Sequence, residues 1–131
     1  MALIPQNLEK LDLLSFHPVA ARTATGDGTG VDIRQYDGKI ELILDSAAAS
    51  AGTNPTLDVT VEHSDSLSTD YTAITGAAFT RVTDAAGGSR QALVIDADAA
   101  RRFVRVKYTI GGTNSPSFTF SVVGVGVRKY G

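Results

Sequence analysis

Apolar and polar residues alternate with a period of two along most of the chain. Residues 57–62 read LDVTVE and residues 103–110 read FVRVKYTI, so apolar residues recur at every second position in each run. Successive side chains of a strand point to opposite faces, and the pattern therefore predicts β-strands with one buried face. Residues 40–44 show the same period, although Ile43 makes their second face less cleanly polar.

Strand candidates of this kind recur at a spacing of about 8–12 residues, joined by segments rich in Gly, Ser and Asp. Two of them, residues 103–110 and 118–128, are separated by a turn at residues 111–116. No long helical pattern alternates with the strands, which disfavours an α/β fold. The sequence predicts an all-β, single-domain β-sandwich of about eight strands, with a jelly-roll or an immunoglobulin-like topology.

Three local features predict details of these strands. Pro18 lies in the first strand candidate and confines it to a sheet edge or a bulge, because proline has no amide hydrogen to donate. Asp37-Gly38 separates two apolar runs and predicts a hairpin with a type I′ turn. Gly124 and Gly126 fall on the apolar face of the last strand candidate, where they predict a bulge or the close approach of another backbone.

Residues 1–14 differ from the rest of the chain. We expect them to form an extended N-terminal arm, followed by a β-sandwich domain at residues 15–131. Apolar residues of the arm include Leu3, Ile4, Leu8 and Leu11. Their spacing fits one or two helical turns, but an isolated helix of this length is marginal in water. We therefore expect an apolar arm that docks either on its own domain or on a neighbouring subunit.

Composition narrows the classes of function. The 131 residues carry a net charge of −2 and include no Cys. The length suits one domain, and the charge argues against a dedicated nucleic-acid binder. The lack of Cys excludes disulfides and a cysteine nucleophile. No apolar run approaches the ~20 residues of a membrane-spanning helix, and no signal peptide is visible. We expect neither nucleic acid nor a membrane as a partner.

The sequence offers little of the chemistry that enzymes use. His17 and His63 lie far apart in the chain without a metal-ligand pattern around them, and no G-x-S-x-G motif is present. The glycine-rich residues 25–30 lack the Lys of a phosphate-binding loop. We expect no catalytic residue, no cofactor and no metal site, and hence no enzyme.

Acidic residues in the loops are expected to act as turn residues that cap backbone amides. Asp96 with Asp98, and Asp65 with Asp70, are such pairs. Weak calcium binding by Asp27, or by Asp65 with Asp70, stays open as an alternative, although neither matches an EF-hand spacing.

Charge is unevenly distributed along the chain. Residues 101–131 contain six basic residues and no acidic one, which leaves a net charge of −8 for the remainder. Arg105 and Lys107 fall on the polar face of their strand candidate. They are expected either to pair within the sheet, with residues such as Glu41, Asp58 or Glu62, or to pair across a boundary between subunits or with an acidic partner surface.

Three motifs follow one another in the second half of the chain. The strand candidate at residues 57–62 ends in residues 63–65 (HSD), residues 103–106 (FVRV) are punctuated by arginine, and residues 111–118 form a Gly-Gly…Ser-Pro-x-Phe link. In this order the motifs resemble those of small virion proteins of tailed bacteriophages. The resemblance covers roughly residues 55–130.

The resemblance implies an auxiliary capsid protein, also called a decoration or cement protein. Such proteins bind the outside of an icosahedral phage head, often as trimers at three-fold and quasi-three-fold positions, and brace the shell against internal DNA pressure. The implied partners are the major capsid protein and further copies of the chain. The implied location is the exterior of the virion, after assembly in the host cytoplasm. Such proteins carry no catalytic residues.

Within this interpretation, the expected contact residues with the capsid or a neighbouring subunit are Leu3, Ile4, Leu8, Leu11, Arg105 and Lys107. Two other functions stay open. One is another phage structural role, as a head-completion or tail protein. The other is a carbohydrate-binding β-sandwich module, although sugar sites usually display exposed aromatic rings and this chain has no Trp.

Overall fold

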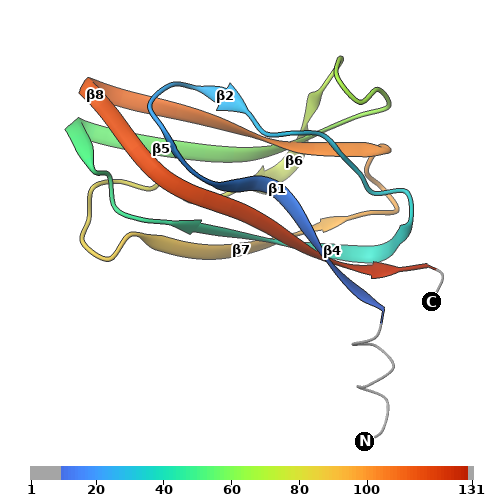
Figure 1. The fold of residues 1–131 in the computed structure, drawn as a ribbon. Helices are drawn as coiled ribbons and strands as arrows, with labels where there is room; N and C mark the ends of the chain where they lie inside the picture. The colour runs from blue at the N-terminus through green and yellow to red at the C-terminus, as the bar shows by residue number, and fades with distance from the viewer. Residues whose placement is uncertain (1–9, 130–131) are drawn as a thin grey trace, which may run out of the picture.

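The computed structural model describes residues 10–129, and in this range all regular secondary structure is β (Figure 1). The strands are β1 (Leu11–Arg22), β2 (Gly26–Asp27), β3 (Val31–Asp32), β4 (Tyr36–Ser46), β5 (Ala51–Ser64), β6 (Thr72–Ala78), β7 (Ser89–Asp96) and β8 (Phe103–Arg128). The predicted all-β class is confirmed.

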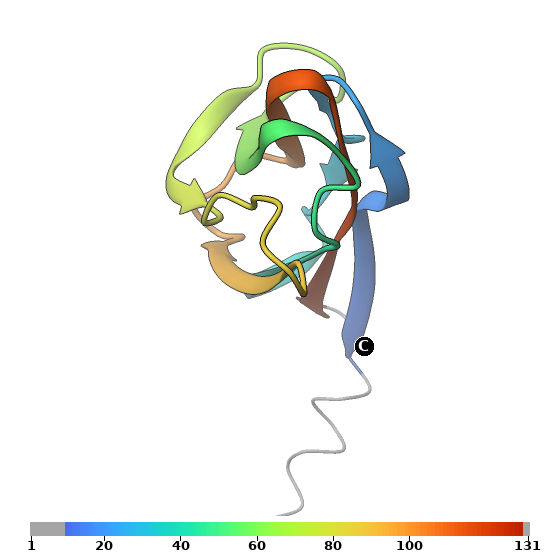
Figure 2. The same cartoon turned by 90° about the vertical axis from the view of Figure 1, so that its left-hand side faces the viewer.

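The strands form two antiparallel layers that share β8. In the first sheet the order is β7-β4-β8-β1, and this sheet uses the C-terminal half of β8. In the second sheet the order is β6-β5-β8, with the short strands β2 and β3 on the far side of β8. Along the chain, β1, β4 and β7 belong to the first sheet and β2, β3, β5 and β6 to the second, while β8 contributes to both. This antiparallel two-layer arrangement is that of the predicted β-sandwich. In Figure 2 the two sheets enclose the core from opposite sides.

β8 passes from the second sheet to the first through a sharp turn. Gly112, Asn114 and Ser115 have φ between +56° and +110°, and positive φ is the conformation that tight turns require. Figure 1 shows the ribbon of β8 reversing its direction here. Residues 103–110 pair with β5, whereas residues 118–128 pair with β1 and β4.

The alternating apolar residues fill the space between the sheets. The alternation in β4, β5 and β8 is reproduced as alternating buried and exposed positions. The fully buried side chains come from both sheets and from the edge strand β1; among them are Phe16, Leu42, Val59, Val106, Phe118 and Phe120.

The Asp37-Gly38 hairpin prediction is wrong. Both residues lie inside β4, and the pairing of β4 with β8 shifts in register between Asp37 and Glu41, which is a bulge. Gly38 does have the positive φ that the prediction required, at +72°. A glycine of this conformation suits a bulge as well as a turn, and here the carbonyl of Gly38 accepts the amide hydrogen of Ala97 at 2.7 Å.

The close approach predicted at Gly124 and Gly126 is present, but the neighbouring group is not a backbone. A Cβ atom on Gly124 would lie 2.5 Å from the Phe16 ring, and one on Gly126 would lie 2.8 Å from the Tyr36 ring. The register of β8 against β1 is unbroken at both positions, whereas its register against β4 shifts opposite Gly126, between Asp37 and Glu41. The glycines therefore leave room for two core aromatic rings.

The first strand begins inside the segment expected to be an arm. β1 starts at Leu11, which pairs with Val127 of β8, and Leu14 is buried in the core. Pro18 lies within the second of the two register shifts of β1, between His17 and Ala20, at the edge of the first sheet, as its chemistry predicts. Leu3, Ile4 and Leu8 lie outside the described residues.

Candidate functional site

The outer face of the second sheet carries an arginine held by several groups of the same chain. Arg105 of β8 donates from Nε to Glu62 of β5 at 3.0 Å and lies 3.6 Å from Asp27 of β2. Its guanidinium stands 3.9 Å from the centre of the Tyr71 ring. The Arg105 side chain is only 22% exposed and that of Glu62 only 12%. This cross-strand pair is one of the intramolecular partnerships that the sequence left open.

Lys107 differs from Arg105 although it shares the same face. It is exposed, and no ion pair of its side chain is found within residues 10–129. Its strand neighbours are Thr60 on one side and Asp27 on the other. Of the two basic residues predicted as contacts, Lys107 is the one available to a partner.

The basic C-terminal segment is largely neutralised within the chain. Besides Arg105, the ion pairs are Arg101 with Asp65, Arg102 with Asp32, and Arg128 with Asp12. Burial disfavours ionisation of Asp32, but its bonds from Arg102 and from the Arg34 amide outweigh that effect and hold the pKa of the carboxyl below its usual value. The charge asymmetry of the sequence thus reflects mainly pairing between distant parts of one chain.

The outer face of the first sheet carries a band of exposed apolar residues, bordered by the ion pairs Lys39–Asp96 and Arg90–Asp45. Leu13 of β1 is 82% exposed and Val94 of β7 is 55% exposed. The register places Leu13 beside Val125, Val125 beside Glu41, and Glu41 beside Val94. The neighbouring row runs from Ser15 through Val123 and Ile43 to Ala92. We call this surface the apolar face; it comprises Leu11, Leu13, Ile43, Ala92, Val94, Val123, Val125 and Val127.

Sequence reasoning did not assign a role to the apolar face. The signal was present, because Ile43 interrupts the polar side of its strand and residues 122–127 (VVGVGV) carry valines on both faces. A strand that is apolar on both faces is typical of a strand covered on both sides. Leu11, the one predicted contact residue of the arm within the described range, lies at the β1 end of this face and is 37% exposed.

The apolar face ends at an open sheet edge. Among residues 10–129, β1 pairs with β8 alone, so within this range its other side offers unpaired backbone groups along part of its length. Pro18 and the two register shifts interrupt the second half of that edge. The first half, which carries Leu11 and Leu13, is therefore the part suited to strand addition.

Both histidines have structural roles. His17 is 1% exposed, stacks on Phe120 with ring centres 4.2 Å apart, and accepts the Nε hydrogen of Arg22 at 2.9 Å. Burial and, secondarily, the charge of Arg22 lower the pKa of His17, while the Phe120 backbone acts in the opposite direction. His63 accepts the backbone amide of Arg101 through Nδ1 at 3.1 Å, and burial, followed by the Arg101 charge, lowers its pKa.

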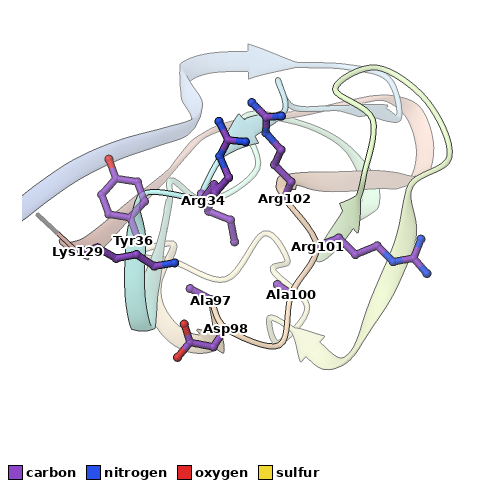
Figure 3. Close-up of a pocket in the computed structure, with 9 residues that line it drawn as sticks. Arg34, Tyr36, Ala97, Asp98, Ala100, Arg101, Arg102 and Lys129 are labelled. Atoms are coloured by element: carbon purple, nitrogen blue, oxygen red, sulfur yellow. The ribbon is translucent and has the colours of Figure 1, made fainter.

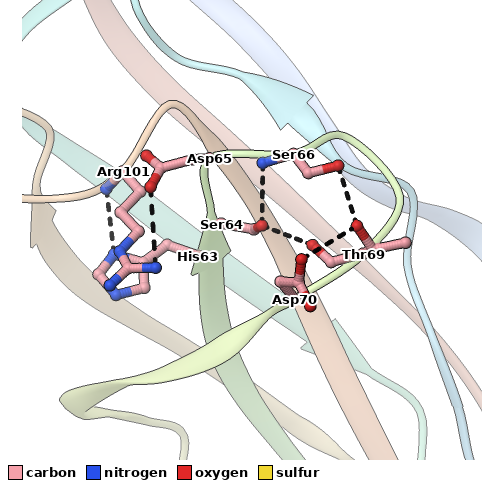
Figure 4. Close-up of polar contacts among 7 residues, drawn as sticks. All are labelled: His63, Ser64, Asp65, Ser66, Thr69, Asp70 and Arg101. Atoms are coloured by element: carbon pink, nitrogen blue, oxygen red, sulfur yellow. Dashed lines mark hydrogen bonds and ion pairs between the residues drawn. The ribbon is translucent and has the colours of Figure 1, made fainter.

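Of the two acidic pairs expected to cap backbone amides, only the pair at Asp96 does so, whereas Asp65 and Asp70 contact side chains. Asp96 Oδ1 accepts the amide of Asp98 at 3.0 Å. In Figure 4, Asp65 pairs with Arg101, and Asp70 accepts from the Thr69 hydroxyl. Asp27 lies in the Arg105 cluster. Within residues 10–129 no three acidic or histidine side chains are grouped so that they could hold a metal ion.

A cavity of about 290 Å³ opens where the sheets end near the C-terminus of β8 (Figure 3). Its walls come from residues 33–36, from the turn at residues 97–102 and from Lys129. Apolar side chains of Ile33, Tyr36, Ala97 and Ala100 form part of the lining, and Arg34, Arg101, Arg102 and Lys129 supply cations.

A search for membrane-crossing helices among the described residues finds none of sufficient length and apolarity.

Comparison with known proteins shows the fold. No protein-family model and no curated protein sequence matches the chain. The SPBc2 prophage-derived protein YomS superposes with a TM-score of 0.50 and 13% identity, over 90% of this chain and 93% of that one. The VP2 subviral particle of infectious bursal disease virus superposes with a TM-score of 0.52 and 14% identity, over 90% of this chain and 32% of the VP2 chain. At these identities the likeness concerns the β-sandwich itself.

Proposed function

We propose that the protein is a structural protein of a tailed-phage virion that decorates the outer surface of the icosahedral capsid, as a trimer at three-fold and quasi-three-fold sites. Its partners are the major capsid protein and other copies of itself. Its location is the virion exterior, after assembly in the host cytoplasm. The motif resemblance of residues 55–130 supports this role. Among solved structures with the same fold, one comes from a prophage and one from a virus particle.

The observation that carries the proposal is the apolar face and the open edge at which it ends. A monomeric protein rarely exposes a contiguous apolar surface unless that surface meets a partner. Leu13 and Val94 lie on opposite edge strands of the first sheet, so the face extends across its width. A flat sheet surface of this kind suits a broad contact with another protein rather than a pocket for a small substrate.

The N-terminal contacts follow from the same geometry. Leu11 lies on the apolar face, and residues 1–9, with Leu3, Ile4 and Leu8, lead directly into it. We propose that these residues contact the capsid or a neighbouring subunit together with this face. Lys107 is the exposed cation that remains for a polar contact on the second sheet, whereas Arg105 is engaged within the chain.

The first test measures assembly directly. The mass of the purified protein is determined by light scattering, and the protein is then sedimented with phage heads that lack it. A trimer that saturates the heads at many copies is the expected result. A protein that does not bind the heads would overturn the decoration role.

A truncated variant tests the N-terminal contact separately. Deletion of residues 1–9 leaves β1 intact, since the strand starts at Leu11. We expect this variant to keep its thermal stability and to bind heads at least about tenfold more weakly, the loss of roughly 1.4 kcal/mol. Equal affinity of the full-length and truncated proteins for heads would show that residues 1–9 are not part of the interface.

Two other functions receive less support. A head-completion or tail protein would be present in few copies or away from the shell, which the saturation number distinguishes. A carbohydrate module would need free aromatic faces. Of the half-exposed rings in the described range, Tyr71 lies under Arg105 and Phe103 lies under Arg102, so neither presents a free face for stacking.

A further inference from the structure

The cavity at the end of the sandwich combines an apolar floor with cations from separate parts of the chain. Ile33 and Tyr36 are 2% and 3% exposed, so their side chains are fixed by the core. Figure 3 shows Arg34 and Arg102 pointing to the same side, with Lys129 approaching from the opposite wall. Asp98 and Arg101 point away from the centre. This arrangement places positive charge beside an apolar surface.

Most backbone amides of the cavity lining already have acceptors. The amides of Ile33, Tyr36, Ala97, Ala100 and Lys129 donate to backbone carbonyls. Those of Arg34 and Asp98 donate to Asp side chains, and that of Arg101 donates to His63. A phosphate-binding loop requires free, convergent backbone amides, and the lining does not offer them. An anionic ligand would therefore be recognised by side chains.

The cationic side chains of the cavity differ in whether they already pair with an acidic residue of the chain. Arg102 is held by Asp32, through Nε at 3.1 Å and Nη2 at 3.0 Å. Arg34 and Lys129 make no side-chain hydrogen bond or ion pair within residues 10–129. Arg102 is thus fixed in place, whereas Arg34 and Lys129 are available to a new anion.

We propose that this cavity binds an acidic peptide segment, with one carboxylate between Arg34 and Lys129 and a neighbouring apolar side chain on the floor. A carboxylate carries one charge and is attached to an aliphatic chain, which matches a cationic rim beside Ile33 and Ala100. A hydrated phosphate would lose water against that floor without backbone donors to replace it.

The surroundings of Arg34 favour a peptide over a free carboxylic acid. A second hollow of about 160 Å³, lined by Asp32, Arg34 and Gln35, shares Arg34 with the first. Two adjoining hollows with one residue in common accommodate successive parts of an extended chain. The second hollow is polar and suits the peptide's main-chain groups. The proposal does not rest on the capsid role.

The test is an NMR titration of the full-length, isotope-labelled protein. The probe is acetyl-Gly-Leu-Glu-Leu-Gly-amide, and its matched control carries Gln in place of Glu. Four-methylpentanoate represents a free carboxylic acid. We expect saturable shifts confined to the amides of residues 32–36, 97–102 and 129 with the Glu peptide, and binding of the Gln peptide at least about tenfold weaker, since charge-assisted hydrogen bonds are the strong ones.

Variants localise the effect. The double variant Arg34→Gln, Lys129→Gln should weaken the Glu peptide at least about tenfold, whereas Arg90→Gln, on the distant surface of β7, should leave its affinity unchanged. Unchanged spectra elsewhere establish that the variants are folded. Equal binding of the two peptides, shifts outside the cavity, or saturable binding of the free acid without the peptide would each overturn the proposal.

Discussion

At the scale of single residues, the space above Gly124 is the most sharply constrained position in the core. The Phe16 ring occupies the place where any other residue would have its Cβ atom. Phe16 is itself fully buried between the sheets, so it cannot move aside without displacing other core side chains.

We predict that Gly124→Ala destabilises the protein by about 1–3 kcal/mol, the usual cost of overpacking a core. Urea denaturation monitored by circular dichroism measures the change. Gly87→Ala is unsuitable as a control because Gly87 has a positive φ, whereas Ala78→Gly at an exposed position gives the background cost of a small backbone change. A Gly124→Ala protein as stable as the parent would contradict the packing account.

His17 links stability to pH. Its pKa is lowered in the folded state by burial and by Arg22, so the folded protein binds its proton less readily than the unfolded chain does. Stability contributed in this way is fully present above the ordinary histidine pKa of about 6.5 and is lost as the pH falls through and below that value.

We predict that the urea concentration at the unfolding midpoint decreases as the pH is lowered from 7.5 to 5.5. The decrease should be smaller in the His17→Phe variant. Phe preserves the ring stacked on Phe120 and removes the titrating group. The pKa of His63 is lowered as well, so His63→Asn serves as the comparison. The same pH dependence in His17→Phe and in the parent would exclude His17 as the titrating group.

At the scale of elements, Arg105 and Lys107 of β8 look alike in the sequence but have different cross-strand contacts. Arg105 is covered by Glu62, Asp27 and Tyr71, whereas Lys107 projects into solvent. Removing Arg105 leaves the carboxylate of Glu62 poorly solvated and without its main partner.

We predict that Arg105→Met lowers the free energy of unfolding by about 1–3 kcal/mol, while Lys107→Met changes it by less than about 0.5 kcal/mol. Urea denaturation of both variants under the same conditions provides the comparison. Equal effects of the two substitutions would show that the Arg105 cluster contributes nothing beyond ordinary surface pairing.

Features of the fold that depend on one segment of the chain could be predicted from the sequence, whereas features that depend on contacts between distant segments could not. Period-two alternation identified the inward positions of β4, β5 and β8, because the apolar residues of a buried strand face alternate within the sequence of that strand. The role of Asp37-Gly38 was misassigned because a positive φ serves a bulge and a turn equally well. Which ring would fill the space at Gly124, and which acid would meet Arg105, depend on pairing between segments far apart in the chain.

The candidate site was reached only in part. The polar face with Arg105 and Lys107 was placed correctly on its strand. Of the three acidic partners considered, only Glu62 meets Arg105, since Asp58 pairs with Arg81 and Glu41 lies in the first sheet. The apolar face was missed because its members come from β1, β4, β7 and β8, and no single strand shows the whole surface. The cavity was missed for the same reason, since Arg34, Arg102 and Lys129 meet only after both sheets have formed.

At the scale of the whole molecule, the outer faces of the two sheets differ in their surface chemistry. The outer face of the second sheet presents mainly polar and charged residues. That of the first sheet combines the ion pairs Lys39–Asp96 and Arg90–Asp45 with exposed valines and leucines. A charge placed on the apolar face should therefore affect association more than folding.

We predict that Val94→Lys leaves the free energy of unfolding within about 0.5 kcal/mol of the parent and weakens self-association or head binding at least about tenfold. Thr109→Lys, exposed on the opposite sheet beside Asp58, is the matched control and should bind as the parent does. Light scattering and co-sedimentation measure both. Undiminished binding by Val94→Lys would remove the apolar face from the interface.

β8 also determines at which point of its synthesis the domain can fold. β8 pairs with β1, β2, β3, β4 and β5, and it is synthesised after all of them. Until residues 103–128 leave the exit tunnel, the growing chain holds its first strands without the partner that joins them, with their apolar sides open to water. Such distant pairings also make for slow folding. The order of synthesis therefore leaves the strands made first without their central partner until β8 has emerged.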